Sequence, residues 1–172
     1  MPNRMDRQEA EALVMVQKVL ADVPGVVPVA QGLSYFGEHA LGWMGLAAAG
    51  AAVDKKRRRE WVALGASAFT AHAASVVIKR VVRRKRPSDH RIRIGVGTPS
   101  KLSFPSSHAS STSAALVSLA MLTKSPIPLV GVPIMMLARM VLGVHYPTDT
   151  LAGAVIGATT AKKIADYERT HK

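Results

Sequence analysis

The chain has no cysteine and few acidic residues, and both shortages limit what it can be. Without cysteine it has no disulfide framework, no thiolate nucleophile and no cysteine-based metal site. Only 11 Asp and Glu stand against 23 Lys and Arg, which gives a formal net charge of +12. Such a balance favours an anionic partner: nucleic acid, an acidic membrane surface or a phosphorylated substrate.

The N-terminus also lacks the apolar core of a signal peptide, because Glu9 and Glu11 follow closely after the start. Hydrophobic residues nevertheless make up 48% of the chain and gather in long blocks with the charges between them. A soluble nucleic-acid-binding protein would mix its charges with short apolar runs. The distribution therefore indicates a membrane protein and no nucleic-acid partner, and the length indicates one domain, residues 1–172.

Five apolar blocks are candidates for membrane spans. Each is close to the roughly 17 residues that a helix needs to cross a bilayer core. Five buried helices in a soluble protein would need more interior than 172 residues enclose. The sequence thus predicts an all-α, polytopic transmembrane helix bundle with a core over residues 37–164. The blocks are Gly37–Val53, Trp61–Ile78, Pro105–Thr123, Pro126–Val144 and Thr148–Ile164.

Residues 1–30 precede this core as an amphipathic segment. The run from Asp6 to Glu9 resembles a capping box that opens a helix. The helix is expected to lie at the membrane interface, and a soluble helix packed on a loop is the alternative. Residues 22–25 and Pro28 are expected to end it. The pairs Gly45-x3-Ala49 and Gly153-x3-Gly157 predict close helix packing within one bundle, with dimerisation as the alternative.

Several charged residues stand inside the apolar blocks or at their ends, where they are costly and therefore candidates for function. If the third span runs away from the face that bears the basic loop 79–104, the fourth span returns to that face. Connectivity alone then brings four separated segments together. These segments carry Lys79, Arg86, Ser106 to His108, and Arg139 with His145 and Asp149.

These residue types suit phosphoryl transfer. A phosphate is doubly negative, and its transition state spreads charge over three equatorial oxygens that Lys and Arg can neutralise. Pro105 favours the first turn of a helix, so the N–H groups of the next three residues would be free to bind an anion. Asp149, four residues after His145, is placed to hold one ring nitrogen while the other attacks phosphorus. His108 would then protonate the departing alkoxide.

Three motifs in this order resemble the signatures of the type 2 phosphatidic acid phosphatase (PAP2) superfamily. Their spacing and their placement at span ends agree with the family pattern, and the resemblance covers roughly residues 61–164. It implies an all-helical enzyme that needs no metal or other cofactor and works through a phosphohistidine intermediate. The motifs read Lys79-x6-Arg86-Pro87, Pro105-Ser106-Ser107-His108 and Arg139-x5-His145-x3-Asp149.

The resemblance also assigns a role to each matching residue. His145 is the nucleophile, Asp149 is its orienting partner and His108 is the general acid. Two positions depart from the family pattern, because Ser107 stands where glycine is usual and Ala138 where serine is usual. Both departures put the fine geometry in doubt and leave the reaction class unchanged. The residues that bind or line the phosphate are Lys79, Arg86, Ser106, Ser107 and Arg139.

Within the superfamily, the short chain and the stretch 95–111 are most similar to actinobacterial phosphatases of decaprenylphosphoryl-5-phosphoribose. This similarity implies a phosphorylated lipid as substrate, membrane lipids as surroundings and a multi-pass place in the bacterial inner membrane. The alternatives are another lipid phosphate (a polyprenyl pyrophosphate, phosphatidic acid or phosphatidylglycerol phosphate), or a non-catalytic lipid-binding protein. The oligomeric state is not predicted.

Other interpretations remain open at this stage. A metal site built from His108, His145 and Asp149 is the rival chemistry, although the Lys and Arg residues nearby would repel a divalent cation. His72 fits a hydrogen-bonded interior histidine or a substrate contact, and His39 with its neighbour Glu38 fits the interface. The basic cluster at 80–93, Arg84 included, is expected to meet anionic lipid or to steer an anionic headgroup. Basic residues divide evenly between the two faces, so the orientation is not predicted.

Overall fold

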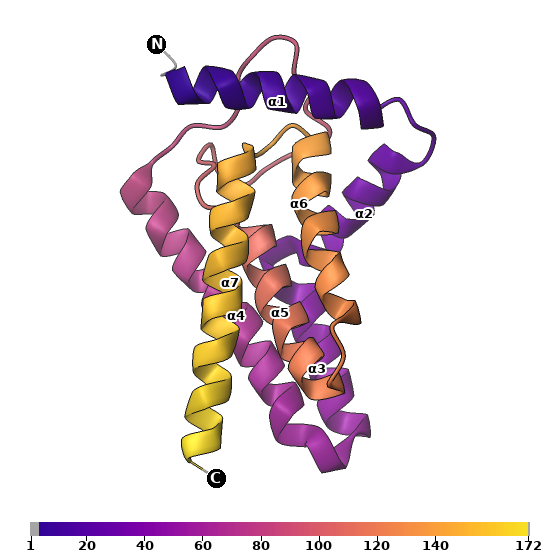
Figure 1. Ribbon diagram of the computed structural model, residues 1–172, viewed down its shortest axis with the longest axis vertical. Helices are drawn as coiled ribbons and strands as arrows, with labels where there is room; N and C mark the ends of the chain where they lie inside the picture. Colours follow the sequence, from indigo (N-terminus) through magenta and orange to yellow (C-terminus); the bar gives the residue numbers. More distant parts are fainter. Residues whose placement is uncertain (1–3, 172) are drawn as a thin grey trace.

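The computed structural model describes residues 4–171 and is built from helices (Figure 1). Within these residues there is no strand, only an isolated bridge between Lys85 and Leu102. The predicted all-α class is therefore confirmed. The helices are α1 (Arg4–Leu20), α2 (Val26–Gly37), α3 (Leu41–Val53), α4 (Arg58–Val82), α5 (Ser107–Thr123), α6 (Gly131–Val141) and α7 (Pro147–Thr170), with short 3-10 turns η1 (Glu38–Ala40), η2 (Lys55–Arg57) and η3 (Ile127–Val130).

Helices α3 to α7 run lengthwise through the molecule, and α1 lies across one end of them (Figure 1). Helix α5 packs against α4, α6 and α7, so its side chains are buried on nearly every side. Gly153 and Gly157 let α7 approach α5 closely, since a Cβ at either position would collide with backbone atoms of α5. Ser113 of α5 also donates a 2.8 Å hydrogen bond to the carbonyl of Ala154. The expected close packing within one bundle is confirmed at Gly153 and Gly157. It is wrong at Gly45, where an added Cβ would meet nothing within 4 Å.

The prediction of one unbroken span over Gly37–Val53 is wrong. His39 and Ala40 adopt left-handed backbone angles (φ 50° and 61°), and they break the chain between α2 and α3. Helix α2 itself was not expected, because Pro28 was taken as a breaker. Pro28 lies in the first turn of α2. No intrahelical hydrogen bond there requires the N–H group that proline lacks, so the helix accommodates Pro28 instead of ending at it.

The other predicted spans correspond to helices with different ends. Pro105 follows a cis peptide bond from Phe104 and lies before α5, not in its first turn. The fourth block is divided into η3 and the short α6. Helix α7 continues past Ile164 to Thr170. Within residues 4–171, only Lys55–Val82 combines the length and the apolar composition of a membrane span, and Ile127–Val141 is a shorter apolar helix. The number of spans therefore stays a prediction.

Helix α1 packs on the basic loop that follows α4 and on the junction between α6 and α7. Its Leu13 and Ala10 are buried against Ile92 and Tyr146. Gln17 donates to the carbonyls of Arg93 and Val141, at 2.7 and 2.8 Å. The expected capping box is wrong, because the helix already begins at Arg4 and the carboxylates of Asp6 and Glu9 bind a side chain elsewhere. Helix α1 therefore packs on a loop, and its place at the membrane interface stays a prediction.

Candidate active site

The motif residues meet at the end of the bundle that α1 covers. There a cavity of about 630 Å³ opens between α2, α4, α5, α6 and the loop after α4. Each helix delivers its residue in a terminal turn, which is why segments far apart in sequence converge as connectivity predicts. The motif side chains that line the cavity are Lys79, Arg86, Ser107, His108, Arg139 and His145.

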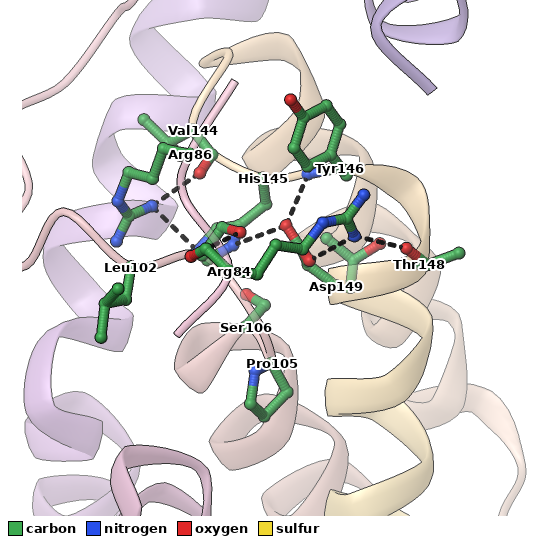
Figure 2. Close-up of polar contacts among 12 residues, drawn as sticks. Arg84, Arg86, Leu102, Pro105, Ser106, Val144, His145, Tyr146, Thr148 and Asp149 are labelled. Atoms are coloured by element: carbon green, nitrogen blue, oxygen red, sulfur yellow. Dashed lines mark hydrogen bonds and ion pairs between the residues drawn. The ribbon is translucent and has the colours of Figure 1, made fainter. Parts of the chain in front are cut away.

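His145 lies in the loop between α6 and α7 and is 2% exposed. Its Nδ1 atom is 3.6 Å from Oδ2 of Asp149, which is longer than a hydrogen bond. The carboxylate is instead fixed by other donors, because Oδ2 accepts from the Tyr146 N–H at 2.8 Å and Oδ1 accepts from Arg84 at 2.9 Å (Figure 2). Asp149 is therefore held in place independently of the histidine that it faces.

The opposite nitrogen of His145 faces Arg86. Arg86 Nη1 donates to the carbonyl of Val144 at 2.6 Å and lies 3.3 Å from Nε2 of His145 (Figure 2). Burial, together with the positive charges of Arg86 and Arg139, lowers the pKa of His145 well below its usual value. Burial also lowers the pKa of Arg86 to about 10, which leaves it cationic at neutral pH. The ring of His145 is thus neutral and keeps a lone pair for chemistry.

Two further cations of the motifs, Lys79 and Arg139, line the cavity. Lys79 Nζ donates to the carbonyls of Ser103 and Pro105, at 3.2 and 2.9 Å, and so holds the loop to α4. Arg139 is 2% exposed and donates to the hydroxyl of Ser34 at 2.5 Å. Its Nε atom is buried and has no hydrogen-bond partner within residues 4–171. A buried guanidinium N–H without an acceptor is costly, and an anion in the cavity would supply one.

His108 is held by the same residue as Arg139. Its Nε2 atom lies 2.9 Å from the carbonyl oxygen of Ser34, which leaves Nδ1 for another partner. Ser34 therefore positions two predicted site residues at once, the carbonyl for one and the hydroxyl for the other. No sequence pattern pointed to Ser34, because the helix that carries it was not expected.

The two serines of the second motif have different surroundings. Ser107 lines the cavity, and its hydroxyl is bonded to Ser75 of α4 at 2.8 Å. Ser106 is fully buried outside the lining, caps α5 and donates its N–H to the carbonyl of Asp149 at 2.9 Å. The expectation that the Ser106 N–H is free for an anion is therefore wrong. Ser107 and His108 open the helix, so their N–H groups have no intrahelical acceptor.

Arg84 is a site residue that the sequence interpretation missed. It was grouped with cations that meet lipid, yet its side chain is only 13% exposed and stacks 4.1 Å from the ring centre of Tyr146. It binds Asp149 on one side and the α1 carboxylates of Asp6 and Glu9 on the other, at 2.6 and 2.5 Å. These ion pairs raise the pKa of Arg84 above its already high value. The sequence signal that could have revealed its role is the pair Asp6 and Glu9, two acidic residues three positions apart in a chain with only 11 Asp and Glu.

Glycine at position 37 leaves room for His108. A Cβ at Gly37 would lie 2.8 Å from the His108 ring, whereas a Cβ at Gly32 in the same helix would meet nothing within 4 Å. We expect Gly37→Ala to displace the His108 ring and lower kcat about 10-fold, because proton transfer depends on its position. Gly32→Ala, measured in the same phosphate-release assay, should keep wild-type kcat. Equal activity of both variants would show that the position of His108 does not limit turnover.

The arrangement can bind a phosphate and attack it with a neutral histidine. The site lacks a set of metal ligands, because no group of three or more His, Asp or Glu side chains within residues 4–171 is placed to hold an ion. The cations around the cavity match the charge of a phosphate instead.

Comparison with known proteins identifies the family. The model of the PAP2 superfamily matches residues 60–170. Decaprenylphosphoryl-5-phosphoribose phosphatase of Mycolicibacterium smegmatis is 60% identical over 147 residues, which cover 86% of this chain and 82% of that protein. The Mycobacterium tuberculosis protein of the same name is 52% identical over 159 residues and covers 92% of this chain and 90% of its own.

Two solved structures share the fold. The transmembrane PAP2-type phosphatidylglycerolphosphate phosphatase from Bacillus subtilis has a TM-score of 0.76 at 21% identity, over 98% of this chain and 86% of its own. LpxE from Aquifex aeolicus has a TM-score of 0.75 at 18% identity, over 91% and 94%. The chain belongs to the PAP2 superfamily.

Proposed function

We propose that this PAP2 superfamily member is a metal-independent lipid phosphate phosphatase. Its substrate is decaprenylphosphoryl-5-phosphoribose, from which it releases the 5-phosphate and leaves decaprenylphosphoryl-ribose. The substrate is taken from the names of relatives that are 52% and 60% identical to this chain over most of its length. The product would serve as an arabinan precursor for the cell wall.

The observation that carries the reaction class is a buried, neutral histidine in a cavity lined by four cationic side chains, three of which belong to the motifs. Lys79, Arg86 and Arg139 supply positive charge for the phosphate oxygens, and Arg86 lies beside the reactive Nε2 of His145. The unpaired Nε of Arg139 would gain its acceptor from the bound phosphate. Fixed charges of this kind stabilise the transition state because they need not reorganise during the reaction.

The mechanism follows in two displacements. His145 Nε2 attacks phosphorus, the N–P bond forms, and the P–O bond to the 5-oxygen of the sugar breaks. His108 gives a proton to that oxygen as it leaves. His108 then accepts a proton from a water molecule whose oxygen attacks phosphorus. The new P–O bond forms as the N–P bond breaks, which releases inorganic phosphate and restores His145. Asp149 faces Nδ1 of His145 at 3.6 Å, and its negative charge favours a proton on that nitrogen, which leaves the Nε2 lone pair for the attack.

We infer that residues 1–172 form one membrane-embedded domain in the bacterial inner membrane. Support comes from the apolar length of Lys55–Val82 and from the shared fold with transmembrane PAP2 proteins. The cavity then lies at one membrane face, beneath α1, where the phosphate of a lipid headgroup would be found. The exposed Met15 and Val19 give α1 an apolar outer side for the membrane interface.

Phosphate release from a panel of lipids tests the proposal. Purified protein in detergent would be given decaprenylphosphoryl-5-phosphoribose, a polyprenyl pyrophosphate, phosphatidic acid and phosphatidylglycerol phosphate, each with and without a chelator. The first lipid should give the highest kcat/KM, and the chelator should change no rate. Preference for another lipid would replace the substrate, release that required a divalent metal would contradict the mechanism, and no release at all would favour a lipid-binding protein.

A further inference from the structure

The cavity extends beyond the groups that the phosphate chemistry uses. Its lining also contains Glu38 and His39 from η1 and His72 from α4. The rings of His39 and His72 are 5.9 Å apart although the two residues belong to different segments. The mechanism assigns none of the three a role.

The position of these residues relative to His108 indicates which part of a substrate they face. In an in-line displacement the leaving oxygen departs on the side opposite the nucleophile, and His108 protonates it there. Gly37 lies next to the His108 ring, since a Cβ added to it would be 2.8 Å from that ring, and Glu38 and His39 come next in the chain. The group attached to the leaving oxygen therefore extends from His108 toward η1.

The backbone at η1 is strained, which is a second indication that this segment has a function. His39 and Ala40 are consecutive non-glycine residues in the left-handed region, at a cost of about 1–2 kcal/mol each. Ala40 is fully buried in the core, while His39 is exposed to the cavity. A continuous helix from α2 into α3 would avoid the strain, but it would not turn the chain at this point beside the cavity.

One of these groups is buried without a partner, and the other two are open to the cavity. His72 Nδ1 is buried and has no hydrogen-bond partner within the described chain. The Glu38 carboxylate lies 3.8 Å from the His39 ring, beyond hydrogen-bonding distance, and 37% of its side chain is exposed. A carboxylate and two imidazoles thus offer one strong acceptor and several groups that can donate or accept.

We propose that Glu38, His39 and His72 form a leaving-group subsite that binds the hydroxyl groups of a sugar. The proposal rests on the proposed function, in which the leaving group is a ribose. Neighbouring hydroxyls donate well to a carboxylate, and an imidazole can accept from one hydroxyl and donate to another. An apolar tail would leave these polar groups unsatisfied, and the negative charge of Glu38 would repel a second phosphate. The subsite would therefore favour a phosphosugar lipid over a lipid phosphate without a sugar.

The test compares two substrates with the same tail: decaprenylphosphoryl-5-phosphoribose and decaprenyl pyrophosphate, which has no sugar. Glu38→Gln and His72→Ala should each lower the ratio of their kcat/KM values about 10-fold, the effect of losing a hydrogen bond with a charged or buried partner. The matched controls are Glu168→Gln, at a partly exposed position near the end of α7, and His90→Ala, at an exposed position. Neither residue lines the cavity, so both variants should keep the wild-type ratio.

A ratio measured on one protein is insensitive to a variant that folds poorly, because both substrates lose the same active fraction. Ratios within about twofold of wild type for both subsite variants would overturn the subsite and leave the proposed function intact. Wild-type protein that hydrolyses the pyrophosphate but not the phosphoribose lipid would overturn both. The two failures are therefore distinguishable in one experiment.

Discussion

Replacing His145 with alanine is expected to lower kcat for phosphate release on the order of 10³-fold or more. The variant removes the atom that forms the covalent bond to phosphorus, and Nε2 of His108, the other motif histidine, is already bound to the Ser34 carbonyl. Substrate binding should change far less, because Lys79, Arg86 and Arg139 remain. The measurement is steady-state release of phosphate from decaprenylphosphoryl-5-phosphoribose, with kcat and KM reported separately.

His90→Ala is the control for this variant, because His90 is a well exposed histidine outside the cavity and its loss should leave kcat unchanged. Thermal unfolding in detergent should show that His145→Ala remains folded. Residual activity within 10-fold of wild type in a folded variant would mean that another group attacks phosphorus.

Replacing Arg84 with alanine is expected to destabilise the protein by about 3 kcal/mol and to lower kcat about 100-fold. The change leaves Asp149 fully buried without its cation and releases Glu9 from the same guanidinium. Asp149 would then be free to move relative to His145, which explains the loss of kcat. Arg84→Lys keeps the charge but loses the fork that binds several carboxylates, so we expect an intermediate result.

Arg91→Ala is the matched control, because Arg91 also pairs with an α1 carboxylate, Glu11, but does so at the surface. It should cost less than about 1 kcal/mol and leave kcat unchanged. Thermal unfolding in detergent and phosphate release would be measured on all three variants. If Arg84→Ala loses stability but keeps kcat, Arg84 holds α1 without positioning the catalytic carboxylate.

Much of the site could be predicted from the sequence because its residues stand out chemically. Arg139, His145 and Asp149 are polar residues at the end of an apolar block, and simple connectivity brings them to the face that carries Lys79 and Arg86. Lys79, Arg86, Arg139 and His145 do line one cavity. Asp149 is outside the lining, with its carboxylate 3.6 Å from His145. The helices around them followed from the apolar blocks in the same way.

The residues that were missed act through long-range pairing, which composition does not reveal. Arg84 is one of many basic residues in its loop, and only the folded chain shows that α1 supplies Glu9 and Asp6 to bury it. Ser34 was missed because Pro28 was taken to end a helix, whereas it occupies the first turn of one. The break at His39 is set by backbone angles that residue types do not indicate.

The account depends most on a covalent bond between His145 and phosphorus, and trapping that bond tests it directly. The lipid labelled with ³²P in its 5-phosphate would be mixed with protein, quenched rapidly in alkali and analysed by peptide mass spectrometry. We predict a label that is stable in base, labile in acid and located on His145, and absent from His145→Ala. A label on another residue, or full turnover by wild-type protein with no labelled intermediate under these conditions, would contradict the mechanism.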